Sequence, residues 1–286
     1  ITPGNHDPYS DSSPYKLIEW PENVFIFNTE QLSFLEIDSL NVRIYGSAYM
    51  GKTKAPLCNA DFKAKDDGKI NILLHHGDID VPGSSYCPIS KEVLSQSGFD
   101  YVALGHIHKG TDILNAGKTN YAYCGCIEGR DFGETGYKGA IIGTIDKSVI
   151  SLKHVRISSK RYEVISQDVT GAHSFSDVAY DIAKSCSGFG DDTLLRVELT
   201  GITSEDFSAD VDILRQLIPA VSYLEIKDST QPMLNLSKLK EDKSLAGEFY
   251  RNLESALYSP DEHERQIATL ALKYGLRAIY GMEIKA

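Results

Sequence analysis

The chain has 286 residues, of which 42% are hydrophobic and 24% are charged, and this ordinary globular composition allows one large domain or two to three smaller ones. The formal net charge of −11 argues against indiscriminate adhesion to DNA. It does not exclude a nuclease, since bound divalent ions, a basic patch or a partner subunit can meet phosphates locally. No apolar run approaches the length of about 18 residues that a membrane span needs, so we expect no membrane-spanning segment.

The five cysteines are odd in number and poorly spaced for a disulfide framework: Cys58, Cys87, Cys124, Cys126 and Cys186. We therefore expect reduced thiols and a cytoplasmic protein. The pair Cys124-x-Cys126 resembles half of a zinc site, but no second Cys or His pair follows it at a suitable spacing.

Near the start of the chain, Gly4-Asn5-His6-Asp7 gathers an amide, an imidazole and a carboxylate within three positions. The amide oxygen of Asn5 is a hard ligand for a divalent cation, and His6 can give or take a proton near neutral pH. Asp7 is expected to orient the imidazole of His6. The alternative is an ordinary loop, because Asn and Asp also bond their own backbone in turns.

The next predicted elements are a hairpin and a short helix. Residues 33–37 and 42–46 alternate like the strands of a hairpin, with Leu40-Asn41 near its turn. Residues 90–97 are typical of a helix that is capped by Ser90 and stopped by Gly98.

Two apolar, β-type segments lead into histidines. Residues 70–74 run into His75-His76-Gly77, and residues 101–104 run into Gly105-His106-Ile107-His108. The carboxyl ends of strands are where active sites collect in α/β folds. We interpret the histidines outside the candidate site as structural: His76, His154, His173 and His263.

Strands predominate after His108, as in a layered sheet sandwich, at residues 111–114, 119–123, 140–145 and 149–156. A polar boundary follows near residues 158–161. Beyond it, strands at 162–169, 193–200 and 222–226 alternate with helices at 176–186 and 210–218, an order that predicts a small α+β domain. Val178, Ile182 and Cys186 share one helix face, and Pro219 ends the second helix.

The tail is predicted to be helical. One apolar stripe consists of Phe249, Leu253 and Leu257, and Ser259-Pro260-Asp261-Glu262 predicts a capping box with proline in the first turn. A second stripe follows at Ile267, Leu270, Ala271 and Tyr274. The predicted domains are therefore residues 1–157, 158–232 and 233–286.

The blocks Gly4-Asn5-His6-Asp7, His75-His76-Gly77 and Gly105-His106-Ile107-His108, in this order, resemble the last three signature blocks of the calcineurin-like metallophosphoesterases. Residues 123–139 are similar to the segment that follows in SbcD-like DNA repair exonucleases, particularly the YhaO branch, with Cys124 where a proline is usual. The resemblance implies an α/β fold: a metallophosphoesterase-type β-sandwich flanked by helices, a small α+β capping domain and C-terminal helices.

The family also has an Asp-x-His block and a Gly-Asp block, each after a strand, and neither lies upstream of Ile1. Two strand–helix units would take on the order of 60 to 80 residues. We therefore expect the first domain to be N-terminally incomplete, the chain to be the remainder of a longer protein, and its metal site to lack ligands.

The resemblance implies that Asn5, His75 and His106 hold one divalent ion and that His108 holds the other. His6 would stabilise the transition state and help to protonate the leaving oxygen, with Asp7 orienting it. Two ions about 3.5 to 4 Å apart neutralise a phosphodiester and lower the pKa of a bridging water. The mixed nitrogen and oxygen ligands suit manganese, iron or zinc, and the resemblance favours manganese.

The function implied by the resemblance is that of a manganese-dependent exonuclease acting on double-stranded DNA ends in repair. The C-terminal helices would dock on the coiled coil of an SbcC-like ABC-type ATPase, or else pack on their own domain, and a homodimer is also compatible with the sequence. The alternatives are another metallophosphoesterase, acting on nucleotides, cyclic nucleotides or phosphoproteins, and a non-catalytic scaffold that binds DNA or the ATPase.

Overall fold

The protein is described by a computed structural model that covers residues 1–286 except 58–61, 204–206, 208, 219–220, 233–235 and 282–286. Cys58 and the predicted helix-ending Pro219 lie outside the described residues. Among the described residues, no disulfide bond joins the other cysteines, Cys87, Cys124, Cys126 and Cys186. No helix within the described ranges is long and apolar enough to cross a membrane.

The elements of the first part of the chain are, in order, α1 (Pro14–Leu17), β1 (Ser33–Ile37), the 3-10 turn η1 (Asp38–Leu40), β2 (Val42–Gly46), β3 (Ile70–His76), α2 (Lys91–Ser95), β4 (Tyr101–Gly105), β5 (Leu114–Ala116), β6 (Thr119–Tyr123), β7 (Gly139–Ile145) and β8 (Ile150–Arg156). The remaining elements are β9 (Arg161–Asp168), α3 (Phe175–Ser185), β10 (Thr193–Thr200), β11 (Ile202–Thr203), α4 (Val211–Leu217), β12 (Tyr223–Asp228), β13 (Gln231–Pro232), α5 (Leu236–Glu241), α6 (Leu245–Leu257) and α7 (Glu262–Ile279).

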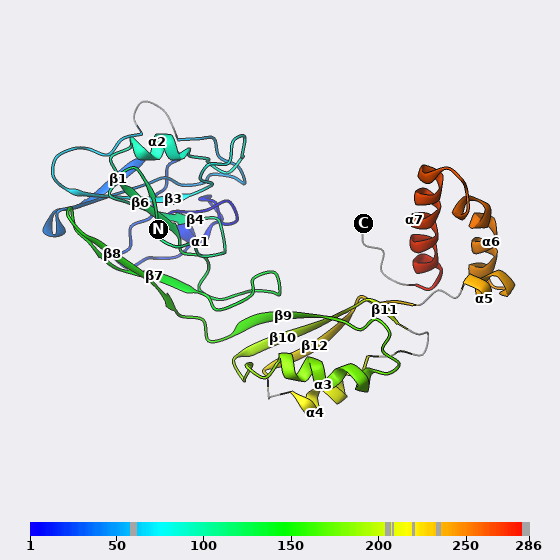
Figure 1. The fold of residues 1–286 in the computed structure, drawn as a ribbon. Helices are drawn as coiled ribbons and strands as arrows, with labels where there is room; N and C mark the ends of the chain where they lie inside the picture. The colour runs from blue at the N-terminus through cyan, green and yellow to red at the C-terminus, as the bar shows by residue number, and fades with distance from the viewer. Residues whose placement is uncertain (58–61, 204–206, 208, 219–220, 233–235, 282–286) are drawn as a thin grey trace. The chain divides into compact units, whose positions relative to one another are not determined.

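A six-stranded mixed sheet, in the order β1-β2-β3-β4-β6-β5, organises the first part of the chain (Figure 1). Its central strands β2, β3, β4 and β6 are parallel, while β1 and β5 pair antiparallel with their neighbours. The predicted α/β class is therefore confirmed. Because parallel strands end at the same edge of a sheet, the loops after β3 and β4 lie side by side.

Local sequence signals placed the first hairpin and α2 correctly. Strands β1 and β2 pair in the register Ile37↔Val42, and Asn41 at the turn adopts a left-handed φ of 54°, which Asn tolerates. The Oγ of Ser90 accepts a hydrogen bond from the backbone N of Val93 at 3.2 Å, which confirms the predicted cap. The helix ends at Ser95, earlier than predicted.

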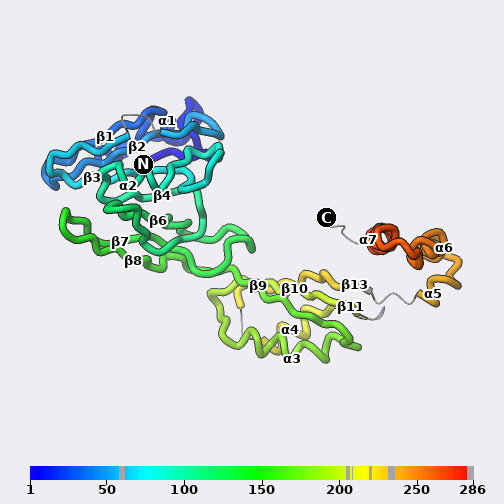
Figure 2. Tube along the Cα trace, turned by 45° about the horizontal axis from the view of Figure 1, so that its top comes forward, coloured from blue at the N-terminus to red at the C-terminus, as the bar shows by residue number. Residues whose placement is uncertain are grey.

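The predicted strand at residues 111–114 is wrong, because β5 begins only at Leu114. Thr111 instead bonds the end of β6: its N donates to the carbonyl oxygen of Tyr123 at 3.0 Å, and its Oγ1 accepts from the N of Tyr123. The ribbon β7–β8 forms as predicted and is a separate antiparallel pair that runs alongside the sheet (Figure 2). His154 on β8 connects the ribbon to the loop before β5, because its Nε2 donates to the carbonyl oxygen of Thr111 at 2.6 Å.

The core beside the sheet consists of side chains from β2, β3, β4, β6 and α2. Leu73, Leu94 and Val102 are fully buried there, and Phe99 packs edge-on against Tyr45. Burial of this apolar surface fixes the strands whose ends carry the histidines.

An ion network around the buried side chain of Arg43 lies at the opposite edge of the sheet, where β2 begins. The side chain of Arg43 is 2% exposed, and its guanidinium donates to Glu36 at 2.7 Å, to Asp67 at 2.6 Å and to the amide oxygen of Asn71 at 3.4 Å. Lys69 adds an ion pair to Glu36 at 2.7 Å. Glu36 and Arg43 face each other across the predicted hairpin, but Asp67 and Asn71, which complete the network, lie 24 and 28 positions from Arg43, and the sequence did not indicate their contacts.

Replacing Arg43 by methionine is expected to lower the free energy of unfolding more than the control variant does, because Asp67 loses its main cation while Glu36 keeps its pair with Lys69. Arg43 lowers the pKa of Asp67 to about 2, so the contribution of this pair is present above the ordinary value of 3.8 and is lost as the pH falls towards 2. Urea unfolding at neutral pH measures the change. The control is Lys16→Met, which removes a solvent-exposed pair with Asp11 and should change the free energy of unfolding only slightly. A loss no larger than that of the control would contradict the role of Arg43.

The described residues divide into two compact units, one of residues 1–165, 183–197 and 215–225, and one of residues 166–182, 198–214 and 226–286. The predicted strand and helix order holds from β9 to β12, and β9, β10 and β12 form one sheet in the order β12-β10-β9. Ile182 and Cys186 are buried as predicted, whereas Val178 is only half-buried. The three predicted domain ranges stay a prediction.

Helices α5, α6 and α7 share a small core of their own. Leu239, Tyr250, Leu272 and Leu276 are buried in it, and the predicted stripe of Phe249, Leu253 and Leu257 packs against them. The predicted capping box is wrong: Asp261, not Ser259, is the N-cap of α7, and its Oδ1 accepts from the N of His263 at 2.8 Å. The second predicted stripe is not the buried face of α7, since Ile267 and Leu270 are about half exposed, at 54% and 51%. The buried residues of α7 are Ala268, Leu272 and Leu276.

Candidate functional site

The site is built at the carboxyl edge of the parallel strands. Strand β3 ends at His76, which pairs in the ladder with Gly105, the last residue of β4. The loop after β4 carries His106 and His108. Strand pairing therefore places His76 next to the Gly105-His106-Ile107-His108 segment, although about 30 residues of sequence separate the two motifs.

The turn at residues 4–7 approaches the same edge. The N of Tyr49, just after β2, donates to the carbonyl oxygen of Pro3 at 3.2 Å and so anchors the turn to the sheet. Asn5 is 7% exposed, and its Oδ1 accepts from Nε2 of His76 at 2.8 Å. Gly4 allows this approach, since a Cβ there would lie 2.5 Å from Cε1 of His76.

His75 and His76 point to opposite sides of β3, because side chains alternate along a strand. His75 is 3% exposed, and its Nε2 bonds the carbonyl oxygen of Cys87 at 2.9 Å. Burial lowers the pKa of His75 to about 3. The structure thus places the predicted ligand His75 in the protein interior and brings His76, which we had interpreted as structural, to Asn5.

His106 lies against His76, with their ring centroids 5.4 Å apart. Its φ of 99° is unusual for a residue with a side chain, and such strained backbone is concentrated at functional sites. Its Nε2 lies 3.6 Å from Oδ1 of Asp78, a carboxylate that is 8% exposed and accepts a hydrogen bond from Ser84. Sequence reasoning missed Asp78, although it directly follows the second histidine block.

His108 is held by a different carboxylate. Its Nδ1 lies 2.6 Å from Oε1 of Glu134, whose side chain is 12% exposed. Glu134 also accepts from Nη2 of Arg130 at 2.8 Å, and Arg130 chiefly lowers the pKa of Glu134 to about 2. Glu134 lies in the segment 123–139 that carries the resemblance, but nothing in the sequence indicated its contact with His108.

The predicted pair of His6 and Asp7 is not brought together. Oδ1 of Asp7 accepts from the N of Gly4 at 3.0 Å, and its Oδ2 accepts from the hydroxyl of Tyr15. Burial and Asp7 together raise the pKa of Tyr15 well above its usual range. Among the described contacts, none joins Asp7 to His6. His6 itself is exposed at the surface of the turn, so Asp7 fixes the turn rather than the imidazole.

The electrostatics of His76 show that the other side chains gather around it. Burial lowers the pKa of His76 to about 4, helped by His106, His6 and His108 and opposed by the negative charge of Asp7. Near neutral pH the imidazole of His76 is therefore uncharged, and a metal bound at Nε2 would take the place of the proton that this nitrogen now shares with Asn5.

The donor atoms fit a divalent cation. Neighbouring ligands on an ion with bonds near 2.1 Å lie about 3 Å apart when they subtend a right angle, and Asn5 Oδ1 and His76 Nε2 are 2.8 Å apart. Amide oxygen, imidazole nitrogen and carboxylate together suit manganese, iron or zinc. In the described part of the chain, no three His, Cys, Asp or Glu side chains already form a complete metal-binding group. Metal binding at this site remains a prediction.

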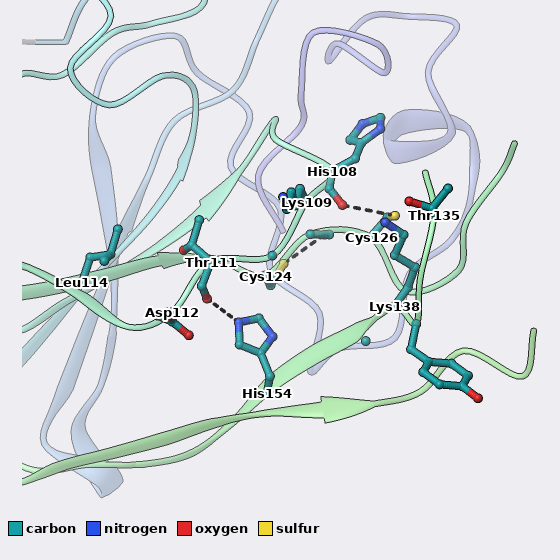
Figure 3. Close-up of a pocket in the computed structure, with 14 residues that line it drawn as sticks. His108, Lys109, Thr111, Asp112, Leu114, Cys124, Cys126, Thr135, Lys138 and His154 are labelled. Carbon is teal, nitrogen blue, oxygen red and sulfur yellow. Dashed lines mark hydrogen bonds between the residues drawn. The ribbon is translucent and has the colours of Figure 1, made fainter. Parts of the chain in front are cut away.

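A cavity of about 620 Å³ adjoins His108 and is lined in part by Lys109, Lys138, Cys124 and Cys126 (Figure 3). The Sγ of Cys126 lies 3.5 Å from the carbonyl oxygen of His108, while the imidazole of His108 extends away from the two cysteine side chains. Lys109 and Lys138 put positive charge beside the histidines of a chain that is acidic as a whole.

The chain is similar in sequence to known proteins. Residues 1–110 match the family model of the calcineurin-like phosphoesterases. The chain is also 33% identical over 180 residues to the Bacillus subtilis (strain 168) protein named uncharacterized metallophosphoesterase YhaO. The alignment covers 60% of this chain and 43% of that protein, so the chain spans less than half the length of this relative.

Proposed function

We propose that this chain takes part in metal-dependent hydrolysis of phosphodiesters and that its substrate is the end of double-stranded DNA. One observation carries the proposal: Asn5 Oδ1 and His76 Nε2 meet at 2.8 Å at the carboxyl edge of the sheet, beside His106 and His108. The similarity of residues 1–110 to calcineurin-like phosphoesterases supports the hydrolysis of phosphoesters.

In this proposal Asn5, His76, His106 and His108 hold divalent ions, with manganese as the preferred metal. A bound divalent ion supplies charge neutralisation and an activated water. His76 is neutral near pH 7, so it binds an ion without first losing a positive charge.

The other residues of the site donate a proton, hold the turn at residues 4–7 in place or attract the phosphates of the substrate. His6 is exposed on the turn next to Asn5, where it can give a proton to the leaving oxygen. Asp7 keeps the turn in shape through Gly4 and Tyr15. Lys109 and Lys138 line the adjoining cavity, where ammonium groups attract the phosphates of a nucleic-acid backbone.

The test is a substrate panel with the purified protein in the presence of Mn²⁺. Linear duplex DNA, closed circular duplex DNA, p-nitrophenyl phosphate and bis(p-nitrophenyl) phosphate are compared at equal phosphate concentration. We expect the linear duplex to be shortened from its ends and the circle to be spared. Hydrolysis of the p-nitrophenyl esters with no preference for DNA ends would contradict the DNA substrate and leave a general phosphoesterase.

Four further expectations stay predictions: a capping role for residues 158–232, the ATPase partner, a homodimer and the cytoplasmic location.

A further inference from the structure

Glu134 reaches His108 across 26 positions of sequence and is itself firmly held. Its Oε2 accepts from the backbone N of Arg130 at 3.0 Å and lies 3.7 Å from Sγ of Cys126. Its Oε1 lies 2.6 Å from Nδ1 of His108. A nearly buried carboxylate with both oxygens engaged has little freedom to turn away from the imidazole.

Arg130 competes for the same nitrogen of His108. Its Nη2 lies 2.8 Å from Nδ1 of His108 and also 2.8 Å from Oε1 of Glu134. A guanidinium only donates, and a carboxylate only accepts. In a neutral imidazole, Nδ1 therefore either carries the proton and donates to Glu134, or lacks it and accepts from Arg130.

The two alternatives have opposite consequences at the far nitrogen of the ring. If Nδ1 carries the proton, Nε2 has a free lone pair and can bind a divalent ion. If Nδ1 accepts from Arg130, Nε2 carries the proton and is blocked. Arg130 finds a better acceptor in Glu134, to which it donates from both Nη2 and Nε.

We propose that Glu134 is a positioning residue: it keeps the proton of His108 on Nδ1, and it occupies Arg130 so that Arg130 does not capture that nitrogen. The metal-related part of this inference rests on the proposed function, because it takes His108 as a ligand. Carboxylates that accept from the second nitrogen of a metal-binding histidine orient the ring and raise its basicity. The tautomer of His108 is a property of the chain alone.

The experiment reads that tautomer in metal-free, ¹⁵N-histidine-labelled protein by NMR at about pH 9, where imidazoles are neutral. The resonances of His108 are assigned by their loss in His108→Gln. We expect the Nδ1–H tautomer in the wild type and in Arg130→Met. We expect Glu134→Leu to shift His108 to the Nε2–H tautomer, because Arg130 is then the remaining partner of Nδ1. Glu134→Gln keeps an acceptor oxygen and should restore the Nδ1–H tautomer, which separates the role of Glu134 from simple packing.

Calorimetry with Mn²⁺ alone tests the consequence for metal binding. Glu134→Leu should weaken Mn²⁺ binding by about 10- to 100-fold, and Glu134→Leu combined with Arg130→Met should recover part of that loss. A wild-type Nε2–H tautomer, or a tautomer unchanged in Glu134→Leu, would overturn the inference. Failure of the DNA substrate panel with the expected tautomers present would refute the nuclease function and not the role of Glu134.

Discussion

Replacing His76 by alanine is expected to weaken Mn²⁺ binding at least about 100-fold. Loss of a residue that only hydrogen-bonds a metal ligand costs about 10- to 100-fold, and loss of a ligand itself should cost more. The reason is geometric, since His76 Nε2 meets Asn5 Oδ1 at 2.8 Å and its ring lies against His106. Hydrolysis should fall with the metal. Calorimetry with Mn²⁺ and the substrate panel measure the two effects.

The neighbouring residue supplies the matched control. His75→Leu removes an imidazole of the same strand, but one whose Nε2 bonds the buried carbonyl oxygen of Cys87. We expect that variant to lose about 0.5 to 1.5 kcal/mol of unfolding free energy, because the buried hydrogen bond to this carbonyl oxygen is lost, and to keep its affinity for Mn²⁺. If His75→Leu loses the metal and His76→Ala keeps it, the ligand assignment must be reversed.

Replacing His6 by alanine is expected to reduce the rate of hydrolysis by about 10²- to 10⁴-fold, the usual contribution of a positioned acid or base. Metal affinity should change little, because His6 is exposed and the contact with His76 belongs to Asn5. Single-turnover rates measured with saturating DNA separate the chemical step from binding.

The control for His6 is His263→Ala, which removes an exposed imidazole from the first turn of α7 and should leave the rate unchanged. Full activity in His6→Ala would contradict the proposed role of His6 as the proton donor. Loss of Mn²⁺ with a retained rate would mean that His6 is a ligand instead.

Sequence periodicity and turn chemistry determined much of the local structure. Residues 33–46 form the predicted hairpin because Asn41 tolerates the left-handed turn and both strands alternate. Ser90 caps α2 through its hydroxyl, as the sequence indicated. At Asp261 the same reasoning failed, since Ser259 and Asp261 are both good caps and only the path of the chain into α7 selects one of them.

The sequence by itself determined that Asn5, His106 and His108 stand in motifs of a phosphoesterase type and that a histidine ends β3. The resemblance pointed to His75 as the ligand and left His76 as structural. Periodicity gave no check on that choice, because the strands of a parallel sheet are apolar on both faces and adjacent histidines hide the phase of the alternation. Only the tertiary structure turned His76 towards Asn5 and His75 towards Cys87. It also brought Glu134 to His108, since such contacts depend on how loops cross the sheet edge and leave no periodic trace in the sequence.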